Sequence, residues 1–178
     1  STLIRSLQDE AVLFDTGRRM ADAQAVGAVL WAGGLDYVAL VVSHFDADHM
    51  GAADRIVCGV DEWPGVAGVD DDGDGMTDAR ELPGEYGMVG SDDFIFASVW
   101  DRGDVALPTT VEMQEYLAAV EGLRYTPLLG EGFDLGLDAF QLEVVTVDGQ
   151  LIGGGQWEVQ DENDRSIALL LSHRGFHL

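Results

Sequence analysis

Two histidines and two aspartates lie within one six-residue segment, His44-Phe45-Asp46-Ala47-Asp48-His49. Imidazole and carboxylate groups together suit zinc, manganese or iron, and four of them exceed what one ion usually takes from a single loop. Alternation along the segment directs His44 and Asp46 toward one ion, and Asp48 and His49, in the turn that follows, toward a second. The segment therefore predicts a site for two divalent transition-metal ions.

The alternative interpretation is a helix N-terminus capped by aspartates, with two histidines that happen to lie nearby. Capping would explain Asp46 or Asp48 taken alone. It does not explain both histidines, because the whole chain contains only four. We therefore favour the metal site.

Residues 37–42, directly before this segment, form an apolar run whose β-branched content is typical of a buried strand. The metal segment is thus expected where a strand ends, with a short helix after it at 52–57. Alternating strands and helices along the chain indicate an α/β fold. The other expected elements are a hairpin over 2–14, a helix at 19–32 with Val26, Val29 and Leu30 on one face, a strand at 92–100, a helix opened by a capping box of Thr109 and Glu112, two short strands within 133–148, and a buried strand at 167–171.

The metal segment resembles the HxHxDH motif of the metallo-β-lactamase superfamily, in its HxDxDH variant. Three stretches, 13–17 (LFDTG), 43–52 (SHFDADHMGA) and 163–171 (NDRSIALLL), are similar to motifs of the ComEC-type competence-protein branch. The resemblance covers nearly the whole chain apart from one insert. It implies an αββα sandwich in which Asp15 is a buried residue behind the metal ligands.

The same resemblance implies a metal-dependent hydrolase that attacks a phosphodiester or another ester with a metal-activated water. In the family's mechanism the aspartate equivalent to Asp48 binds one ion and shuttles the proton. Asp46 replaces a histidine found in many members, which favours manganese or iron somewhat, whereas intrinsic affinities still favour zinc.

The chain also departs from the family pattern. The family's strand with the bridging aspartate would begin where Leu178 ends the chain, and a "GQGD" motif would stand just before Ser1. No histidine between His49 and His173 can serve as the third-motif ligand. The resemblance thus implies one partial domain, residues 1–178, truncated at both ends. The alternative function is a catalytically impaired, secreted and calcium-stabilised binding module on the same scaffold.

A second metal pattern lies in a Gly-, Asp- and Pro-rich insert at about 59–93. Within residues 70–81, acidic side chains occupy positions 1, 3, 5, 9 and 12 and a glycine occupies position 6, which is the calcium-loop pattern. The expected calcium ligands are Asp70, Asp72, Asp74, Met76 through its carbonyl, Asp78 and Glu81. A solvated acidic linker is the alternative. A weak calcium site needs the millimolar calcium found outside the cytosol, so we expect a periplasmic or secreted protein.

Asp101, Arg102 and Asp104 follow a strand, at the edge where the family's fold carries its active site. Arg102 could hold an anionic substrate group, and Asp101 or Asp104 could replace the missing histidine ligand. A plain polar turn is the alternative, and we favour it.

The charge of the chain restricts its partners. Among its 178 residues, 33 acidic side chains oppose nine basic ones, all arginine, for a net charge of −24. Extended nucleic-acid binding needs clustered basic residues and is therefore disfavoured, which leaves a small-molecule ester or phosphoester as the expected substrate. No segment approaches the roughly 20 apolar residues of a membrane span.

Overall fold

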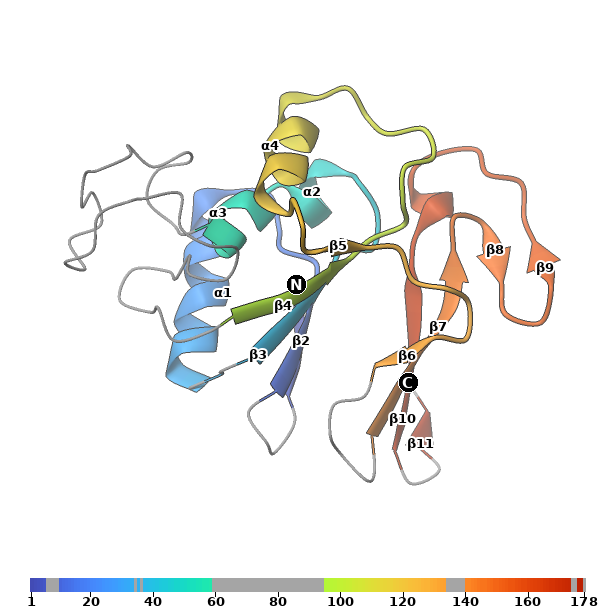
Figure 1. Ribbon diagram of the computed structural model, residues 1–178, viewed down its shortest axis with the longest axis horizontal. Coiled ribbons are helices and arrows are strands. Elements are labelled where there is room, and N and C mark those ends of the chain that lie inside the picture. Colours follow the sequence, from blue (N-terminus) through green and yellow to red (C-terminus); the bar gives the residue numbers. More distant parts are fainter. Residues whose placement is uncertain are drawn as a thin grey trace.

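The computed structural model describes residues 1–5, 10–33, 35, 37–58, 95–133, 140–173 and 176–177, which form two sheets and a set of helices (Figure 1). The first sheet has the order β1 (Thr2–Arg5), β2 (Glu10–Phe14), β3 (Tyr37–Val41), β4 (Ile95–Trp100) and β5 (Arg124–Tyr125). The second sheet contains β6 (Gly132–Phe133), β7 (Phe140–Val147), β8 (Gln150–Leu151), β9 (Gly155–Gln156), β10 (Ala168–His173) and β11 (Phe176–His177). The helices are α1 (Met20–Gly33), α2 (Ala47–Met50), α3 (Ala53–Cys58), α4 (Val111–Ala119) and the 3₁₀ turn η1 (Asn163–Arg165).

Parallel pairing in the first sheet brings three strand ends together. Strands β1 and β2 are antiparallel, as expected for the hairpin, whereas β2, β3, β4 and β5 run parallel. In the register, Phe14 lies opposite Val41, and Val41 lies opposite Trp100. The residues that follow β2, β3 and β4 therefore emerge side by side at one edge of the sheet, the edge where open α/β sheets bind ligands.

Both faces of the first sheet are buried, and alternate residues serve different layers. Leu13 and Leu40 pack in one core cluster with residues of α1, α3 and α4, whereas Val12 and Val41 pack in a second cluster with Leu142 and other residues of the second sheet. Because both faces are covered, the strands need continuous apolar sequence, and this explains the run before the metal segment.

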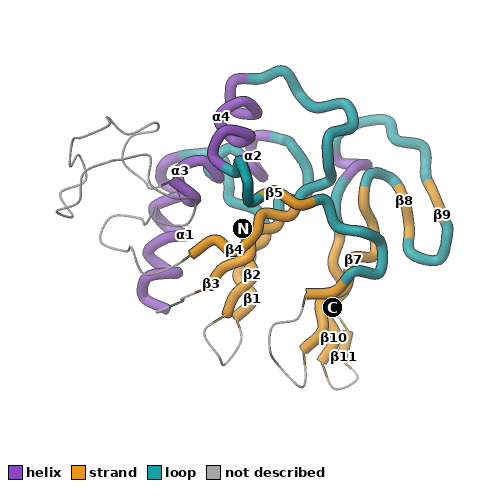
Figure 2. The backbone as a smooth tube through the Cα atoms, in the orientation of Figure 1, coloured by secondary structure: helices purple, strands orange, loops and turns teal. Residues whose placement is uncertain are grey.

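Three layers result, which Figure 2 shows as helices, first sheet and second sheet. The expected α/β class is confirmed at this level. Within the described ranges, no α-helix covers the outer face of the second sheet.

Most of the expected elements agree with the structure, and four details differ. The two short strands expected within 133–148 are the two-residue β6 and the eight-residue β7. The strand expected to be buried at 167–171 is β10, in which residues 168–172 are half-buried and only the preceding Ile167 is buried.

Helix α4 is capped by Thr110, one residue after the expected Thr109, and the Thr110 hydroxyl accepts a hydrogen bond from the Met113 N–H at 3.2 Å. Because Met113 rather than Glu112 stands at the third helical position, the expected capping box does not form. Val29 does not share the buried face of α1. It is 55% exposed and lines an open groove between α1 and the β1–β2 hairpin.

No described helix combines the length and apolar content that crossing a membrane would need. The insert with the calcium pattern, residues 70–81, lies outside the described residues.

Candidate metal centre

The metal segment follows β3 at the common edge of the strand ends. Residues 44–46 form bends after the strand, and Ala47–Met50 form the single turn of α2. Phe45 and Met50 are buried in the core between the sheet and the helices. These two apolar anchors fix the segment so that its polar side chains gather on the other side.

Asp15, directly after β2, organises the centre from behind. Its Oδ1 accepts the Ser43 N–H at 2.8 Å, and its Oδ2 accepts the Ser43 hydroxyl at 2.9 Å. Its Oδ2 also lies 2.8 Å from Nδ1 of His49. Thr16 adds two hydrogen bonds to the His49 carbonyl, from its N–H at 2.7 Å and from its hydroxyl at 2.9 Å. The end of β2 thus holds both the backbone and the ring of His49.

The hydrogen-bond partners favour one tautomer of each neutral imidazole ring. Because the Asp15 carboxylate only accepts, the hydrogen between it and His49 sits on His49 Nδ1. The Ser43 hydroxyl donates its one hydrogen to Asp15 and therefore accepts from His44 Nδ1, 3.0 Å away. In this arrangement each neutral imidazole has the lone pair on Nε2. A carboxylate or hydroxyl on Nδ1 is the usual support of a metal-binding histidine.

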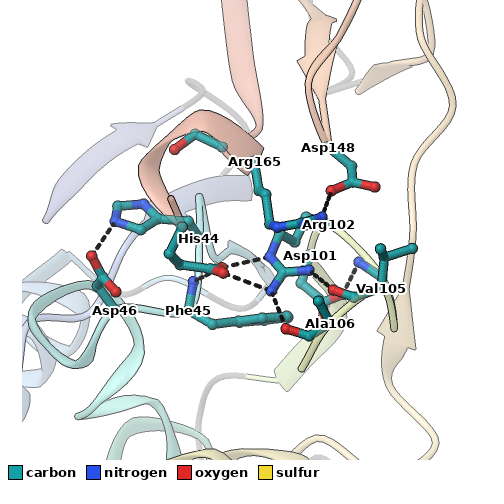
Figure 3. Close-up of polar contacts among 12 residues, drawn as sticks. His44, Phe45, Asp46, Asp101, Arg102, Val105, Ala106, Asp148 and Arg165 are labelled. Atoms are coloured by element: carbon teal, nitrogen blue, oxygen red, sulfur yellow. Dashed lines mark hydrogen bonds and ion pairs between the residues drawn. The ribbon is translucent and has the colours of Figure 1, made fainter. Parts of the chain in front are cut away.

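His44 carries the unsatisfied group of the centre. The residue is 3% exposed, and among the described residues its Nε2 is a buried polar atom without a hydrogen-bond partner. The Asp46 Oδ2 lies 3.5 Å from this nitrogen, which is too far for a hydrogen bond (Figure 3). A lone pair therefore faces a carboxylate oxygen, and only a proton or a metal ion between them relieves this arrangement.

The second histidine forms a similar pair in a more exposed position. His49 Nε2 lies 3.7 Å from the Asp48 Oδ2, and the two imidazole rings are 3.9 Å apart between centroids. Two ligands of one tetrahedral ion, each at about 2.0–2.2 Å from it, stand roughly 3.4 Å apart. The His44–Asp46 and His49–Asp48 separations are close to that value, so each pair is compatible with a shared ion.

The capping interpretation has little support at Asp46. Asp46 occupies the N-cap position of α2, but its side chain makes no capping hydrogen bond. Its carboxylate is left free to face His44 instead.

The described residues supply ligand pairs but no complete set. Within these ranges, no group of three or more His, Cys, Asp or Glu side chains is placed to hold one ion. An ion at either pair would need further ligands, from water or from other groups.

Phe45 links the segment to the second sheet. Its N–H donates to Glu162 Oε1 at 2.9 Å, and the Arg102 guanidinium lies 4.3 Å above its ring centroid. Arg102 binds the Glu162 carboxylate through Nε at 2.5 Å and Nη2 at 2.8 Å. It also donates to the carbonyls of Val105 and Ala106 (Figure 3).

Asp101 belongs to a second network, whose Tyr116 and Arg124 also border Phe45, at 5.7 Å and 5.9 Å from its ring centroid. Its carboxylate accepts from the Tyr116 hydroxyl at 2.7 Å, from the Gly103 N–H at 2.8 Å and from the Arg124 guanidinium. Burial first, and the Asp101 charge second, hold the pKa of Tyr116 well above its ordinary value. Asp104 is exposed and pairs with Arg124. A role of Asp101, Arg102 or Asp104 toward substrate stays a prediction.

Two participants were not picked out as site residues from the sequence, Ser43 and Glu162. Ser43 stands beside the metal segment, so its place in the motif was a local signal. Glu162 has no such signal, because its partners lie 60 and 117 residues away along the chain.

No protein-family model matches this chain, and a search of curated proteins found no match either.

Proposed function

We propose that this chain is a metal-dependent hydrolase of the metallo-β-lactamase fold that acts on a phosphodiester or another ester. The observation that carries the proposal is the orientation of the two histidines. Each Nδ1 is occupied within the protein, and each Nε2 faces a carboxylate oxygen at 3.5 or 3.7 Å. His44, Asp46, Asp48 and His49 would hold the ions.

Contacts among the three stretches that resemble the family's motifs support the fold. Asp15 of the first stretch binds Ser43 of the second, and the Ile167 N–H of the third donates to the Ser43 carbonyl at 2.8 Å. Segments more than 100 residues apart in sequence therefore meet at one residue. Helices on one face of a sheet and a second sheet on the other agree with three of the four expected layers.

The chemistry divides between ions and side chains. Bound divalent ions, zinc or alternatively manganese or iron, would supply Lewis acidity that activates a water and polarises the ester. Asp48 has a side chain that is 73% exposed and lies 3.7 Å from His49 Nε2. Its position lets it accept a proton from water and release it to solvent. Asp15 and Ser43 keep the imidazoles in the tautomer with a free Nε2.

The charges around the centre favour a small substrate. Arg102 after β4, Arg124 in β5 and Arg165 in η1 are each paired with a carboxylate. These three arginines therefore offer no unpaired positive charge to a polyanionic backbone. The chain's net charge of −24 would also repel such a backbone. A small ester or phosphodiester fits this setting better than nucleic acid does.

The test compares two histidine substitutions in the full chain. His49→Ala should lower the number of zinc ions bound per chain, because it removes a ligand of the His49–Asp48 pair, and should abolish the hydrolysis of bis(4-nitrophenyl) phosphate. His173→Ala is the control. Ile167, just before β10, contacts Ser43 of the site, whereas His173 lies at the far end of that strand. Zinc loading by equilibrium dialysis and release of nitrophenolate are the measurements. Hydrolysis that survives His49→Ala at the rate of the unsubstituted protein would end this proposal.

The second candidate is a calcium-stabilised binding module on the same scaffold. It is favoured by the absence of any three-ligand group within the described ranges. The two candidates differ in a direct measurement. Zinc binding without hydrolysis of any ester offered would support the binding module, whereas turnover that is lost on chelation and restored by zinc would support the enzyme.

A further inference from the structure

The charged side chain of Arg102 is completely buried. Its side chain has 0% exposure, and arginine is almost never buried so fully unless it is paired. Glu162 supplies the pairing with two parallel hydrogen bonds, in the two-pronged geometry that a guanidinium forms with a carboxylate. A buried pair of this kind often adds little stability compared with apolar side chains of similar size. Its contribution to stability therefore does not account for its presence.

The pair is placed on the residue between two candidate ligands. The Arg102 guanidinium stacks on the Phe45 ring at 4.3 Å, and Glu162 Oε1 accepts the Phe45 N–H at 2.9 Å. Phe45 is thus held by its ring and by its backbone. The neighbouring residues on either side, His44 and Asp46, carry the nitrogen and the oxygen that face each other at 3.5 Å.

The two members of the pair come from different layers. Arg102 follows β4 of the first sheet, whereas Glu162 lies in the loop between β9 and β10 of the second sheet. The carbonyls of Val105 and Ala106 accept further hydrogen bonds from Nη1 and Nη2 of Arg102. Phe45 also packs in the core against the Tyr116 ring of α4, at 5.7 Å between centroids. Arg102 and Glu162 thus add a restraint from the second sheet to the one that the helical layer provides.

We propose that Arg102 and Glu162 are positioning residues of the metal centre, which clamp Phe45 and so keep His44 Nε2 and the Asp46 carboxylate directed at one ion. This inference rests on the proposed metal site. Metal centres need their ligands within about 0.5 Å of the required positions, and such supporting contacts commonly change metal affinity by roughly ten- to a hundredfold.

The experiment measures Co²⁺ binding by the visible absorption of the bound ion. Glu162→Gln keeps the size of the side chain but removes the charge that pairs with Arg102. We expect about ten- to hundredfold weaker Co²⁺ binding and a changed absorption spectrum. Asp148→Asn is the matched control, because it breaks the pair with Arg165 at a carboxylate of similar exposure, 21% against 17% for Glu162, without touching Phe45.

A second variant covers the case in which Glu162→Gln does not fold. Phe45→Leu removes the ring beneath the guanidinium and leaves every charge in place, and we expect it to weaken Co²⁺ binding and to shift the spectrum. Thermal unfolding of the metal-free proteins separates folding from positioning. A lower melting temperature with an unchanged spectrum and affinity in both variants would overturn the clamp.

The outcomes also separate this inference from the proposed function. If the unsubstituted chain binds neither Co²⁺ nor Zn²⁺, the metal site itself is refuted and the clamp falls with it. If the unsubstituted chain binds Co²⁺ and the folded variants bind it equally well, only the clamp is refuted. Weaker binding in Asp148→Asn to the same degree would likewise count against a specific role of Arg102 and Glu162.

Discussion

At the residue scale, a single carboxylate organises the candidate centre. Asp15 accepts three hydrogen bonds, two from Ser43 and one from His49. Its backbone has φ = 60°, a left-handed conformation that Asp and Asn tolerate better than other side chains with a Cβ. The residue type thus suits both the turn after β2 and the support of His49.

The first prediction concerns this carboxylate. Asp15→Asn keeps the size of the side chain and tolerates the positive φ, but its NH₂ group cannot accept a hydrogen bond. The free energy of unfolding should fall by about 1.5–3 kcal/mol, because hydrogen bonds to a buried charge are lost. Zinc affinity should fall roughly ten- to a hundredfold. Urea unfolding and zinc titration measure the two effects.

Asp22→Asn is the control for this prediction. Asp22 also accepts two hydrogen bonds, from the N–H groups of Arg18 and Arg19, but it lies on the surface at the start of α1. It should leave zinc affinity unchanged. Equal loss of zinc binding in both variants would contradict the role given to Asp15.

The second prediction concerns Asp54, which is 3% exposed and pairs with the adjacent Arg55 at 3.1 Å. Burial raises the pKa of this carboxyl above 3.8, against the opposing charge of Arg55. Between the unfolded and the folded pKa, the folded state binds more protons, so stability falls as the pH rises through that window. Asp54→Asn should therefore be more stable than the unsubstituted protein at pH 7.

That advantage should shrink as the pH falls below 3.8, where Asp54 is protonated in both states. Urea unfolding of both proteins at pH 7 and at pH 3 gives the difference. A larger advantage at pH 3 than at pH 7 would contradict the assigned direction.

At the element scale, the parallel strands do the positioning. Because β2, β3 and β4 end in register, their following residues meet at one edge without any local sequence signal. Asp15 and Ser43 face each other for this reason. For the same reason the Val42 N–H donates a hydrogen bond to the Trp100 carbonyl at 2.8 Å. The one-turn helix α2 then directs Asp48 and His49 to the same side.

The third prediction tests the start of α4. Thr110→Ala should lower the free energy of unfolding by about 1 kcal/mol, because the hydrogen bond to the Met113 N–H is lost. Thr109→Ala is the matched control, since Thr109 is a similarly exposed neighbour that does not cap the helix. Urea unfolding compares the two. A greater loss of unfolding free energy in Thr109→Ala would instead support Thr109 as the cap of α4.

At the scale of the whole molecule, the net charge and the calcium pattern of the insert both affect the stability of the folded state. A net charge of −24 on 178 residues makes the folded state repel itself. A bound cation that gathers several carboxylates relieves part of that repulsion. The pattern at residues 70–81 is the place in the sequence where such a cation is expected.

The fourth prediction tests calcium at this pattern. Calcium at a hundred times its dissociation constant should stabilise the chain by about 2.7 kcal/mol, and chelation should then lower the melting temperature by roughly 5–10 °C. Asp72→Asn and Glu81→Gln should each remove most of this shift. Asp164→Asn, outside the insert, is the control. No shift on chelation would leave residues 70–81 as an acidic linker.

The sequence by itself determined the α/β class, most element positions and the clustering of four potential ligands at a strand end. These follow from periodicity and from neighbours along the chain, which act at short range. Only the tertiary structure decided that both histidines present Nε2, since Asp15 lies 28 residues from Ser43 and 34 from His49. It also decided that Glu162 reaches Phe45 across 117 residues. Contacts at such separations depend on strand register and on the packing of two sheets, which no local pattern specifies.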